Sequence, residues 1–327
     1  MLPLLITGGT GFLGAYLARY ALNSGGEDHV FVLDRYPVKG RVADILDRIT
    51  ILDSDIADTR AVDSIIAQHG IDRIAHFAFI LGSPSPGQMV DYAKVQLVGT
   101  ANVLEAARNH AVRRVLFASS VAAYGSQKAD VLTEDLIPNP ADPYGAAKAW
   151  CEATARHYND RLGLDTVSIR YGSTYGLGRA ARGSYASGML NVPQNLHYMA
   201  RLEDALRGKP VTMPRGDVPA DFSYAADAAK AGWLALTADH LPQRLYNAPS
   251  SRMPIGHFTA AMRKLLPNAE IEEDRSELPG NAHAPMDCTR LVKDLGFVPD
   301  HSLESGIADY MARIRSMDEF ENKDLTE

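Results

Sequence analysis

The stretch TGGTGFLG, residues 7–14, decides the fold. An apolar run, Leu4 to Ile6, precedes it, and a helical pattern that ends near Gly25 and Gly26 follows it. Residues without a Cβ are needed where the chain turns sharply, where backbone approaches a diphosphate and where the helix packs on the strand. The helix N-terminus then faces the phosphates. The stretch therefore predicts a dinucleotide site whose cofactor contacts are Gly8, Gly11, Phe12, Leu13 and Gly14.

An acidic residue ends the next apolar run, Val30 to Leu33. This residue, Asp34, lies 20 residues after Gly14, where a carboxylate can accept hydrogen bonds from both ribose hydroxyls. A carboxylate would repel a 2′-phosphate, so Asp34 favours NAD over NADP. The guanidinium of Arg35 could instead pair with a 2′-phosphate, which keeps NADP as the alternative. After the third strand, Asp55 and Ile56 are expected at the adenine edge, with an ordinary loop as the other interpretation.

Short apolar runs alternate with helical patterns through the first half of the chain. This alternation predicts an α/β fold of the Rossmann type, a doubly wound parallel sheet with a ligand crevice at the carboxyl ends of its strands. Residues 1–175 are expected to form this domain, with 220–248 returning to it. Residues 176–219 and 249–316 are expected to form a smaller C-terminal α/β substrate lobe, and 317–327 an acidic tail. Helices are expected at 99–110, 144–162, 195–206, 257–265 and 303–315.

The composition favours a globular protein that acts on a small molecule. Of the 327 residues 46% are hydrophobic, yet no window reaches the roughly 18 apolar residues of a membrane helix. The net charge is −7 and no basic stripe is visible, which argues against nucleic acid as a partner. The N-terminal run lacks the basic flank of a secretory signal, and Cys151 and Cys288 cannot make a disulfide framework. We therefore expect a cytoplasmic protein without membrane, nucleic-acid or metal ligands.

A second motif, YGAAK, lies at residues 144–148. Tyr144 and Lys148 are one helical turn apart, so phenol and ammonium share a helix face. A nearby ammonium, together with the positive charge of an oxidised nicotinamide, favours the phenolate and makes the tyrosine useful as an acid and base. The strand LFASS, residues 116–120, can present the Ser120 hydroxyl to a substrate oxygen. The pattern predicts hydride transfer with Ser120, Tyr144 and Lys148 as the catalytic set.

These motifs resemble the extended short-chain dehydrogenase/reductase family, and within it the NAD-dependent epimerase/dehydratases. The resemblance extends through HFAF at 76–79, SSVAAYG at 119–125, IRYGSTYG at 169–176, DFSYAAD at 221–227 and LGFVP at 295–299. It implies that Tyr144 is the acid/base, that Lys148 orients the ribose and tunes Tyr144, and that Ser120 bonds the reacting oxygen while Ser119 is structural. It also implies a homodimer through helices 99–110 and 144–162, and further cofactor contacts from Phe77, Ala78 and Tyr171.

Several positions depart from the family pattern. By this resemblance, 4,6-dehydratases of the family carry an acidic pair just after the active-site hydroxyl. This chain has Val121 and Ala122 at those positions, which argues against dehydration. Ala220 replaces the arginine that usually pairs with a substrate diphosphate, and Ser173 and Gln96 each replace an asparagine. The departures leave simple hydride transfer at a secondary alcohol, once in a dehydrogenase or twice in a 4-epimerase.

The substrate is predicted to be sugar-like. Arg179 and Arg182 lie in the segment GRAARGSYASG, residues 178–188, and their guanidinium groups suit a carboxylate as well as a phosphate. Arg275 and Arg215 could meet a substrate phosphate. A nucleotide-sugar 4-epimerase and a dehydrogenase of a sugar acid or polyol both remain open. A catalytically inactive NAD(P)-sensing protein on the same fold is the alternative of a different class. The predicted substrate-binding residues are Ser120, Ser173, Arg179, Arg182, Arg215 and Arg275.

Overall fold

A parallel sheet forms the centre of the molecule in the computed structural model, which describes residues 3–179, 197–274, 276 and 283–324. Its strand order is β10-β6-β5-β4-β1-β2-β3, and all its strand pairs are parallel. Strand β5 is buried along its whole length, as expected for a sheet covered on both faces. The predicted doubly wound fold is confirmed. The strands are β1 (Leu4–Thr7), β2 (Val30–Asp34), β3 (Ile49–Asp53), β4 (Arg73–His76), β5 (Arg114–Ser120), β6 (Thr166–Tyr171) and β10 (Leu245–Asn247).

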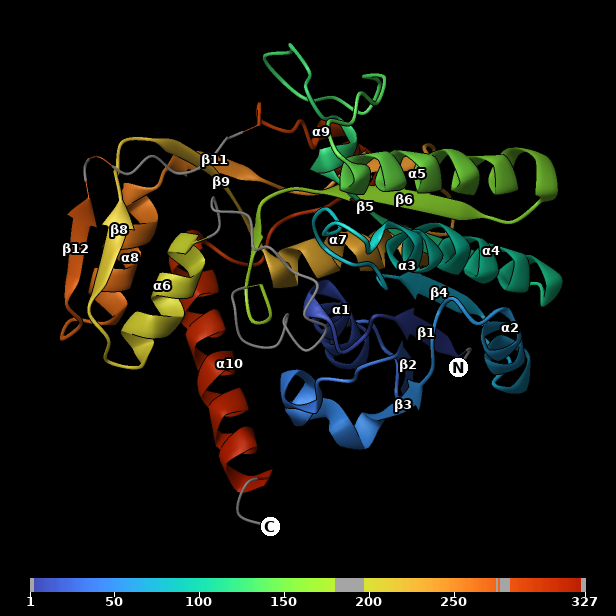
Figure 1. Cartoon of the computed structure of the whole chain (residues 1–327), viewed down its shortest axis with the longest axis horizontal. Coiled ribbons are helices and arrows are strands. Elements are labelled where there is room, and N and C mark those ends of the chain that lie inside the picture. The colour runs from blue at the N-terminus through green and yellow to red at the C-terminus, as the bar shows by residue number, and fades with distance from the viewer. Residues whose placement is uncertain (1–2, 180–196, 275, 277–282, 325–327) are drawn as a thin grey trace.

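Helices cover both faces of this sheet (Figure 1). One face carries α2 (Thr59–Gln68), α4 (Gly99–Asn109) and α5 (Pro143–Leu162), whose apolar side chains form one buried cluster with the sheet. The other face carries α1 (Phe12–Asn23) and α7 (Ala225–Thr237). A 3-10 segment, η1 (Lys39–Arg48), lies beside α1. The returning segment predicted at 220–248 thus supplies α7 and β10 to this domain.

A smaller lobe joins two short sheets with helices. Strand β9 (Pro219–Tyr224) lies between β7 (Thr174–Tyr175) and β11 (Ser251–Pro254), while β8 (Val211–Pro214) pairs with β12 (Ile271–Asp274). The predicted smaller α/β lobe is therefore present, with β9 in it rather than in the main sheet. The helices of the C-terminal half besides α7 are α6 (His197–Leu206), α8 (Gly256–Leu265), α9 (Thr289–Leu295) and α10 (Leu303–Asp324).

The two parts share one hydrophobic core. Tyr16 and Leu17 of α1 belong to the same buried cluster as Phe222 of β9, Phe258 of α8 and Tyr310 of α10. Phe222 and Phe258 stack with their ring centroids 5.6 Å apart. The substrate lobe is therefore packed against the nucleotide-binding part and places its loops beside the carboxyl ends of the strands.

Helix α10 extends beyond its predicted end, and further helical turns precede α4. Helix α10 continues to Asp324 through most of the segment expected to be a separate acidic tail. Met317 is 4% exposed and Arg207 pairs with Asp318 at 3.1 Å, so packing and an ion pair hold this segment in the helix. Helix α4 continues a helical stretch that begins with α3 (Met89–Ala93) and a π-helical turn, η2 (Lys94–Val98). Tertiary packing, which the local sequence does not reveal, extends α10 beyond residue 315.

Candidate active site

The glycine turn is shaped by close backbone approaches. Gly8 has a φ of +68°, and a Cβ there would lie 2.7 Å from the Ala78 amide nitrogen. A Cβ on Gly14 would collide with the Gly8 carbonyl oxygen. Side chains are excluded at these positions, so the N-terminus of α1 stays accessible to an anion. This turn has the shape that a bound dinucleotide diphosphate requires.

Asp34 is held at the end of β2 by Thr10. The Thr10 amide and hydroxyl donate to Asp34 Oδ2 at 2.6 and 2.7 Å. Within the described residues Oδ1 has no hydrogen-bond partner, so this oxygen can accept from a ribose hydroxyl. Desolvation raises the pKa of the Asp34 carboxyl, and the two Thr10 bonds oppose that rise. The arrangement fits an unphosphorylated ribose and hence NAD.

Arg35 is engaged with the other acidic residue of this region. Its Nη1 donates to Asp55 Oδ2 at 2.7 Å, and Asp55 Oδ1 accepts from the Ala57 amide at 2.9 Å. Arg35 and Asp55 both line a cavity at the ends of β2 and β3, where the adenosine of the cofactor is expected. Because the guanidinium already has a carboxylate partner, Arg35 gives little support to NADP.

Two adjoining cavities bring the predicted residues together. The first, of about 710 Å³, lies at the ends of β2 and β3 and is lined by Asp34, Arg35, Asp55 and Ile56. The second, of about 550 Å³, connects the glycine turn with the catalytic side chains. Its walls contain Gly8, Gly11, Phe12, Leu13, Gly14, Phe77, Ala78, Ser120, Tyr144, Lys148, Tyr171, Ser173 and Arg179.

Helix α5 carries the tyrosine and the lysine into this second cavity. The Asp142 side chain caps the helix by accepting from the Gly145 amide at 2.7 Å, and Pro143 starts the first turn. A Cβ on Gly145 would collide with the Ala122 carbonyl oxygen, so glycine lets α5 approach the turn that follows β5, η3 (Val121–Ala123). This close approach brings Tyr144 beside Ser120.

The Tyr144 phenol is desolvated and faces groups that favour its ionised form. Desolvation raises the pKa of Tyr144, whereas the Arg179 guanidinium and the Ser120 hydroxyl lower it and the Asp142 carboxylate raises it. Ser120 Oγ also accepts from the Ala122 amide at 3.2 Å, which fixes its hydroxyl at the end of β5. The phenol and this hydroxyl are therefore positioned to share one substrate oxygen.

Lys148 lies on the same helix face as Tyr144, with its Nζ 5.6 Å from the centroid of the Tyr144 ring. Its ammonium donates to the Ala118 carbonyl at 2.5 Å and lies 3.3 Å from the centroid of the Phe79 ring. Desolvation lowers the pKa of Lys148 to about 7. The carbonyl and the aromatic ring hold the ammonium in the cavity, and the tuning of Tyr144 by Lys148 stays a prediction.

Gln96 replaces an asparagine of the family pattern without loss of bonding. Its Oε1 accepts from the Ile80 amide at 3.0 Å, and its Nε2 donates to the Ile80 carbonyl at 2.8 Å. Ile80 directly follows Phe79, which lines both cavities. Gln96 therefore fixes the backbone of the segment that carries Phe79.

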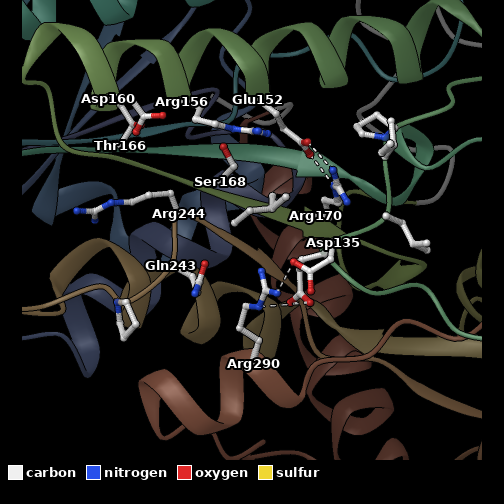
Figure 2. Close-up of a pocket in the computed structure, with 16 residues that line it drawn as sticks. Asp135, Glu152, Arg156, Asp160, Thr166, Ser168, Arg170, Gln243, Arg244 and Arg290 are labelled. Carbon is white, nitrogen blue, oxygen red and sulfur yellow. Dashed lines mark hydrogen bonds and ion pairs between the residues drawn. The ribbon is translucent and has the colours of Figure 1, made fainter.

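A buried ion pair lies behind the catalytic strand end (Figure 2). Arg170 of β6 donates to both carboxylate oxygens of Glu152 of α5, at 2.8 and 2.7 Å. The Ser119 hydroxyl donates to the same carboxylate and so belongs to this buried network. The pair lines a further cavity of about 550 Å³ at the β10 edge of the sheet. Glu152 thus ties α5 to β5 and β6, one turn beyond Lys148.

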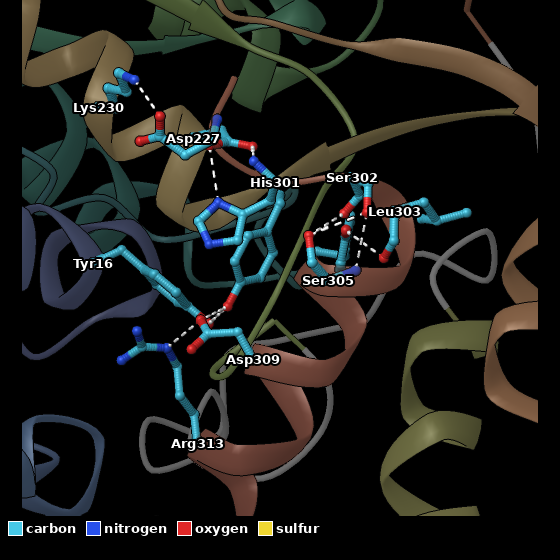
Figure 3. Close-up of polar contacts among 12 residues, drawn as sticks. Tyr16, Asp227, Lys230, His301, Ser302, Leu303, Ser305, Asp309 and Arg313 are labelled. Atoms are coloured by element: carbon cyan, nitrogen blue, oxygen red, sulfur yellow. Dashed lines mark hydrogen bonds and ion pairs between the residues drawn. The ribbon is translucent and has the colours of Figure 1, made fainter. Parts of the chain in front are cut away.

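The segment before Arg179 is fixed by a tyrosine of α1. The Leu177 amide donates to the Tyr16 hydroxyl at 2.9 Å, and Tyr16 lies edge-on to Tyr224. The Tyr224 hydroxyl donates to Asp309, which also accepts from Arg313 Nε at 2.8 Å (Figure 3). Helices α1 and α10 together therefore hold the backbone that brings Arg179 to the cavity.

The substrate side differs from the sequence prediction at Arg215. Its guanidinium is exposed, pairs with Asp217 at 2.5 Å and lines neither cavity of the cleft, because it lies in the loop between β8 and β9. Arg182 and Arg275 lie outside the described residues. Among the predicted substrate residues, the structure brings together Ser120, Ser173 and Arg179.

Two cavity residues have no counterpart in the sequence prediction. His283 lines the catalytic cavity and bonds the Ala284 carbonyl through Nδ1 at 2.8 Å, and its Nε2 has no partner among the described residues. Arg41 lines the other cavity from η1. No motif in the sequence marks His283. Arg41 lies seven residues after Asp34, and only its burial distinguishes it from a surface arginine.

The comparisons with known proteins agree with this geometry. The model of the NAD dependent epimerase/dehydratase family matches residues 4–248. A D-erythronate dehydrogenase of Cupriavidus necator is 31% identical, with 94% of this chain and 97% of that protein covered. A UDP-glucose 4-epimerase of Azospirillum brasilense is 27% identical over 93% of this chain and 89% of that protein. The crystal structure of the Thermotoga maritima UDP-glucose 4-epimerase has a TM-score of 0.78 at 23% identity, covering 96% and 99% of the two chains.

Proposed function

Because the chain belongs to the NAD-dependent epimerase/dehydratase family, we propose that it is a dehydrogenase that oxidises a secondary alcohol of a small sugar acid. The dependence on NAD and the hydride chemistry follow from the family. The choice of a sugar acid is supported by the Arg179 guanidinium in the catalytic cavity and by the partners that already balance the charge of Arg252.

The observation that carries this proposal is the position of Arg179. Its side chain lines both cavities, with the guanidinium 5.8 Å from the centroid of the Phe12 ring. Its Nε is shielded from solvent and has no hydrogen-bond partner among the residues that the structure describes. Desolvation lowers the pKa of Arg179, so the cation is held there at a cost. A substrate carboxylate would supply the missing acceptor beside Tyr144.

The far side of the cavity offers little for a substrate diphosphate among the described residues. Ala220 stands where the family pattern has an arginine, and the facing strand supplies Arg252 instead. Arg252 is already bonded to Asp221 Oδ2 at 2.9 Å and to the His283 carbonyl at 2.8 Å. Its charge is therefore balanced within the protein, which favours a small substrate over a nucleotide sugar.

Each polar side chain of the catalytic cavity can be assigned a role in the oxidation of the alcohol. Arg179 binds the carboxylate and orients the neighbouring carbon, while the Ser120 hydroxyl bonds the oxygen that reacts. Tyr144 as phenolate removes the proton of that hydroxyl, and a carbonyl forms as hydride leaves the carbon. NAD, when bound, supplies the hydride acceptor. Lys148, adjacent to Phe79, would bond the cofactor ribose from the same helix face as Tyr144.

Assembly and location are proposed on separate grounds. A homodimer through α4 and α5 is supported by exposed apolar side chains there, with Trp150 42% and Val98, which directly precedes α4, 45% exposed. Both cysteines are free, as is usual in the reducing cytoplasm. Within the described residues, no helix combines the length and the apolarity that crossing a membrane requires.

The proposal is tested with matched substrates and Arg179 variants. Sugar acids of four to six carbons and the polyols obtained by reducing their carboxyl groups would be compared by kcat/KM. Arg179→Met should lower kcat/KM for the acid by about tenfold to a hundredfold relative to the polyol, because a charge-assisted bond is lost. Arg179→Lys should retain part of this preference. An acid-to-polyol ratio that is unchanged in Arg179→Met would refute the carboxylate assignment.

A further inference from the structure

Arg41 is a buried cation with an incomplete set of partners. It projects from η1 and is 3% exposed. Its Nη1 donates to the Thr10 carbonyl at 3.3 Å, whereas Nε and Nη2 have no hydrogen-bond partner among the described residues. A guanidinium normally satisfies its donors when it is buried, since unmade bonds to a charged group are expensive. The described residues supply no acceptor for these two donors, and a bound anion would supply one.

The neighbours of Arg41 show where that acceptor would lie. The contact with Thr10 places the guanidinium beside Gly11, the residue that caps the N-terminus of α1. On another side Gly178 approaches so closely that a Cβ there would lie 3.1 Å from Arg41 Nε. Arg41 therefore lies between the phosphate-binding turn and the segment that leads to Arg179.

The carboxylates around Arg41 do not neutralise it. Asp34, Glu203 and Glu321 act on the guanidinium through space, but within the described residues none forms an ion pair with it. Desolvation lowers the pKa of Arg41 despite these charges. Asp34 is already bonded to Thr10, and Glu203 accepts from Tyr310 at 2.6 Å. Each of these two carboxylates is directed to another partner.

We propose that Arg41 is a cofactor-binding residue that donates from Nε and Nη2 to the diphosphate of NAD. The diphosphate is the anion that the N-terminus of α1 attracts, and Arg41 supplies a full positive charge on its flank. The 2′-phosphate of NADP fits less well, because it would meet the Asp34 carboxylate. This role is independent of the sugar substrate and does not rest on the proposed oxidation of a sugar acid.

A binding role and a structural role predict opposite effects on stability. Removing a buried charge that lacks a partner relieves its desolvation, so Arg41→Met should melt at a higher temperature than the wild-type protein without nucleotide. With saturating NAD the wild-type protein should melt at the same temperature as Arg41→Met or at a higher one, because bound NAD stabilises the wild-type protein more. An arginine that only holds the fold would give a lower melting temperature in both conditions.

The binding experiment uses the full-length protein freed of nucleotide and isothermal titration calorimetry with adenosine, ADP, NAD and NADP. Arg41→Met should weaken ADP and NAD by about tenfold or more and leave adenosine unchanged. Arg41→Gln provides a second uncharged variant, and Arg41→Lys should retain part of the affinity. Arg48→Met is the matched control, because Arg48 lies in the same segment but bonds the Leu22 carbonyl at 2.6 Å. It should lower stability without changing the preference for ADP over adenosine.

Two results would overturn the proposal. The first is an unchanged preference for ADP over adenosine in both uncharged variants. The second is a loss of NADP affinity that exceeds the loss of NAD affinity, which would place Arg41 at the 2′ position instead. Because no sugar substrate is present, failure here leaves the Arg179 experiment unaffected, and failure of that experiment leaves this one unaffected.

Discussion

Arginines of the sheet interior and of the cleft differ in how their charge is balanced. Arg170, behind β5, is 1% exposed and bonds both oxygens of Glu152, and its guanidinium carbon lies 4.2 Å from the centroid of the Tyr124 ring (Figure 2). In the cleft, Arg41 and Arg179 each retain an Nε without a partner among the described residues. Desolvation acts to lower the pKa of all three arginines, but for Arg170 the bonds and charge of Glu152 oppose it and the pKa is raised.

This difference separates cations that hold the fold from cations that await a ligand. Arg170 keeps an Nη1 without a partner among the described residues, but its Nε and Nη2 hold both oxygens of Glu152, so its removal leaves a buried carboxylate without a counter-charge. An unpaired arginine contributes nothing comparable to folding, and its electrostatic energy is recovered when an anion binds. Substitutions of a paired cation and of an unpaired one test this difference.

The largest effect is expected from Arg170→Met. Glu152 would be left as a buried charge, so the free energy of unfolding should fall by about 3–5 kcal/mol. Urea unfolding of the protein without nucleotide measures this loss. A loss below about 1 kcal/mol would show that the pair is not structural and would remove the contrast with Arg41 and Arg179.

A smaller, pH-dependent effect is expected from Lys148→Met. The folded protein holds Lys148 at a pKa of about 7, below the ordinary value of a lysine, which is about 10.4. Between these values the unfolded chain binds more protons, so this group makes wild-type stability rise with pH by up to about 1.4 kcal/mol per pH unit. Below pH 7 both states are protonated and the contribution is constant.

The measurement compares the free energies of unfolding of the two proteins at pH 7 and pH 9. Lys148→Met should be the more stable protein at pH 7, and its advantage should shrink toward pH 9. An advantage of the same size at both pH values would show that Lys148 is not desolvated as the structure indicates.

The smallest effect is expected from Arg215→Ala. The pair with Asp217 is exposed and screened by solvent, so the free energy of unfolding should not change measurably. The kcat/KM ratio of acid to polyol should also be unchanged, because Arg215 lines neither cavity of the cleft. A change in that ratio would bring Arg215 back as a substrate residue and weaken the case for Arg179.

The cofactor half of the cleft could be predicted because its physics is local. Glycines at residues 8, 11 and 14, with a strand before and a helix after, leave few alternatives for the backbone, and Asp34 follows at the end of the next strand. The pair of Tyr144 and Lys148 is likewise set by one helical turn. The groups that contact these two side chains, such as Phe79 and Ala118 at Lys148, and the Arg179 guanidinium that acts on Tyr144, come from other segments.

The substrate half could not be predicted to the same extent. His283 and Arg41 reach the two cavities through tertiary packing, and nothing in their own segments marks them. Arg215 was predicted from sequence to bind substrate, but in the folded loop its guanidinium donates to Asp217 instead. Sequence shows where charged residues are, whereas only the fold shows which of them lack a partner.

The most direct test is to follow the reduced cofactor during turnover with excess NAD. The purified protein would be mixed with each sugar acid, and the absorbance of NADH compared with the amount of substrate consumed. A dehydrogenase produces one NADH for each molecule of acid oxidised, and this is the result we predict. Conversion of the acid, or of a nucleotide sugar, into a stereoisomer without net NADH would contradict it and indicate an epimerase.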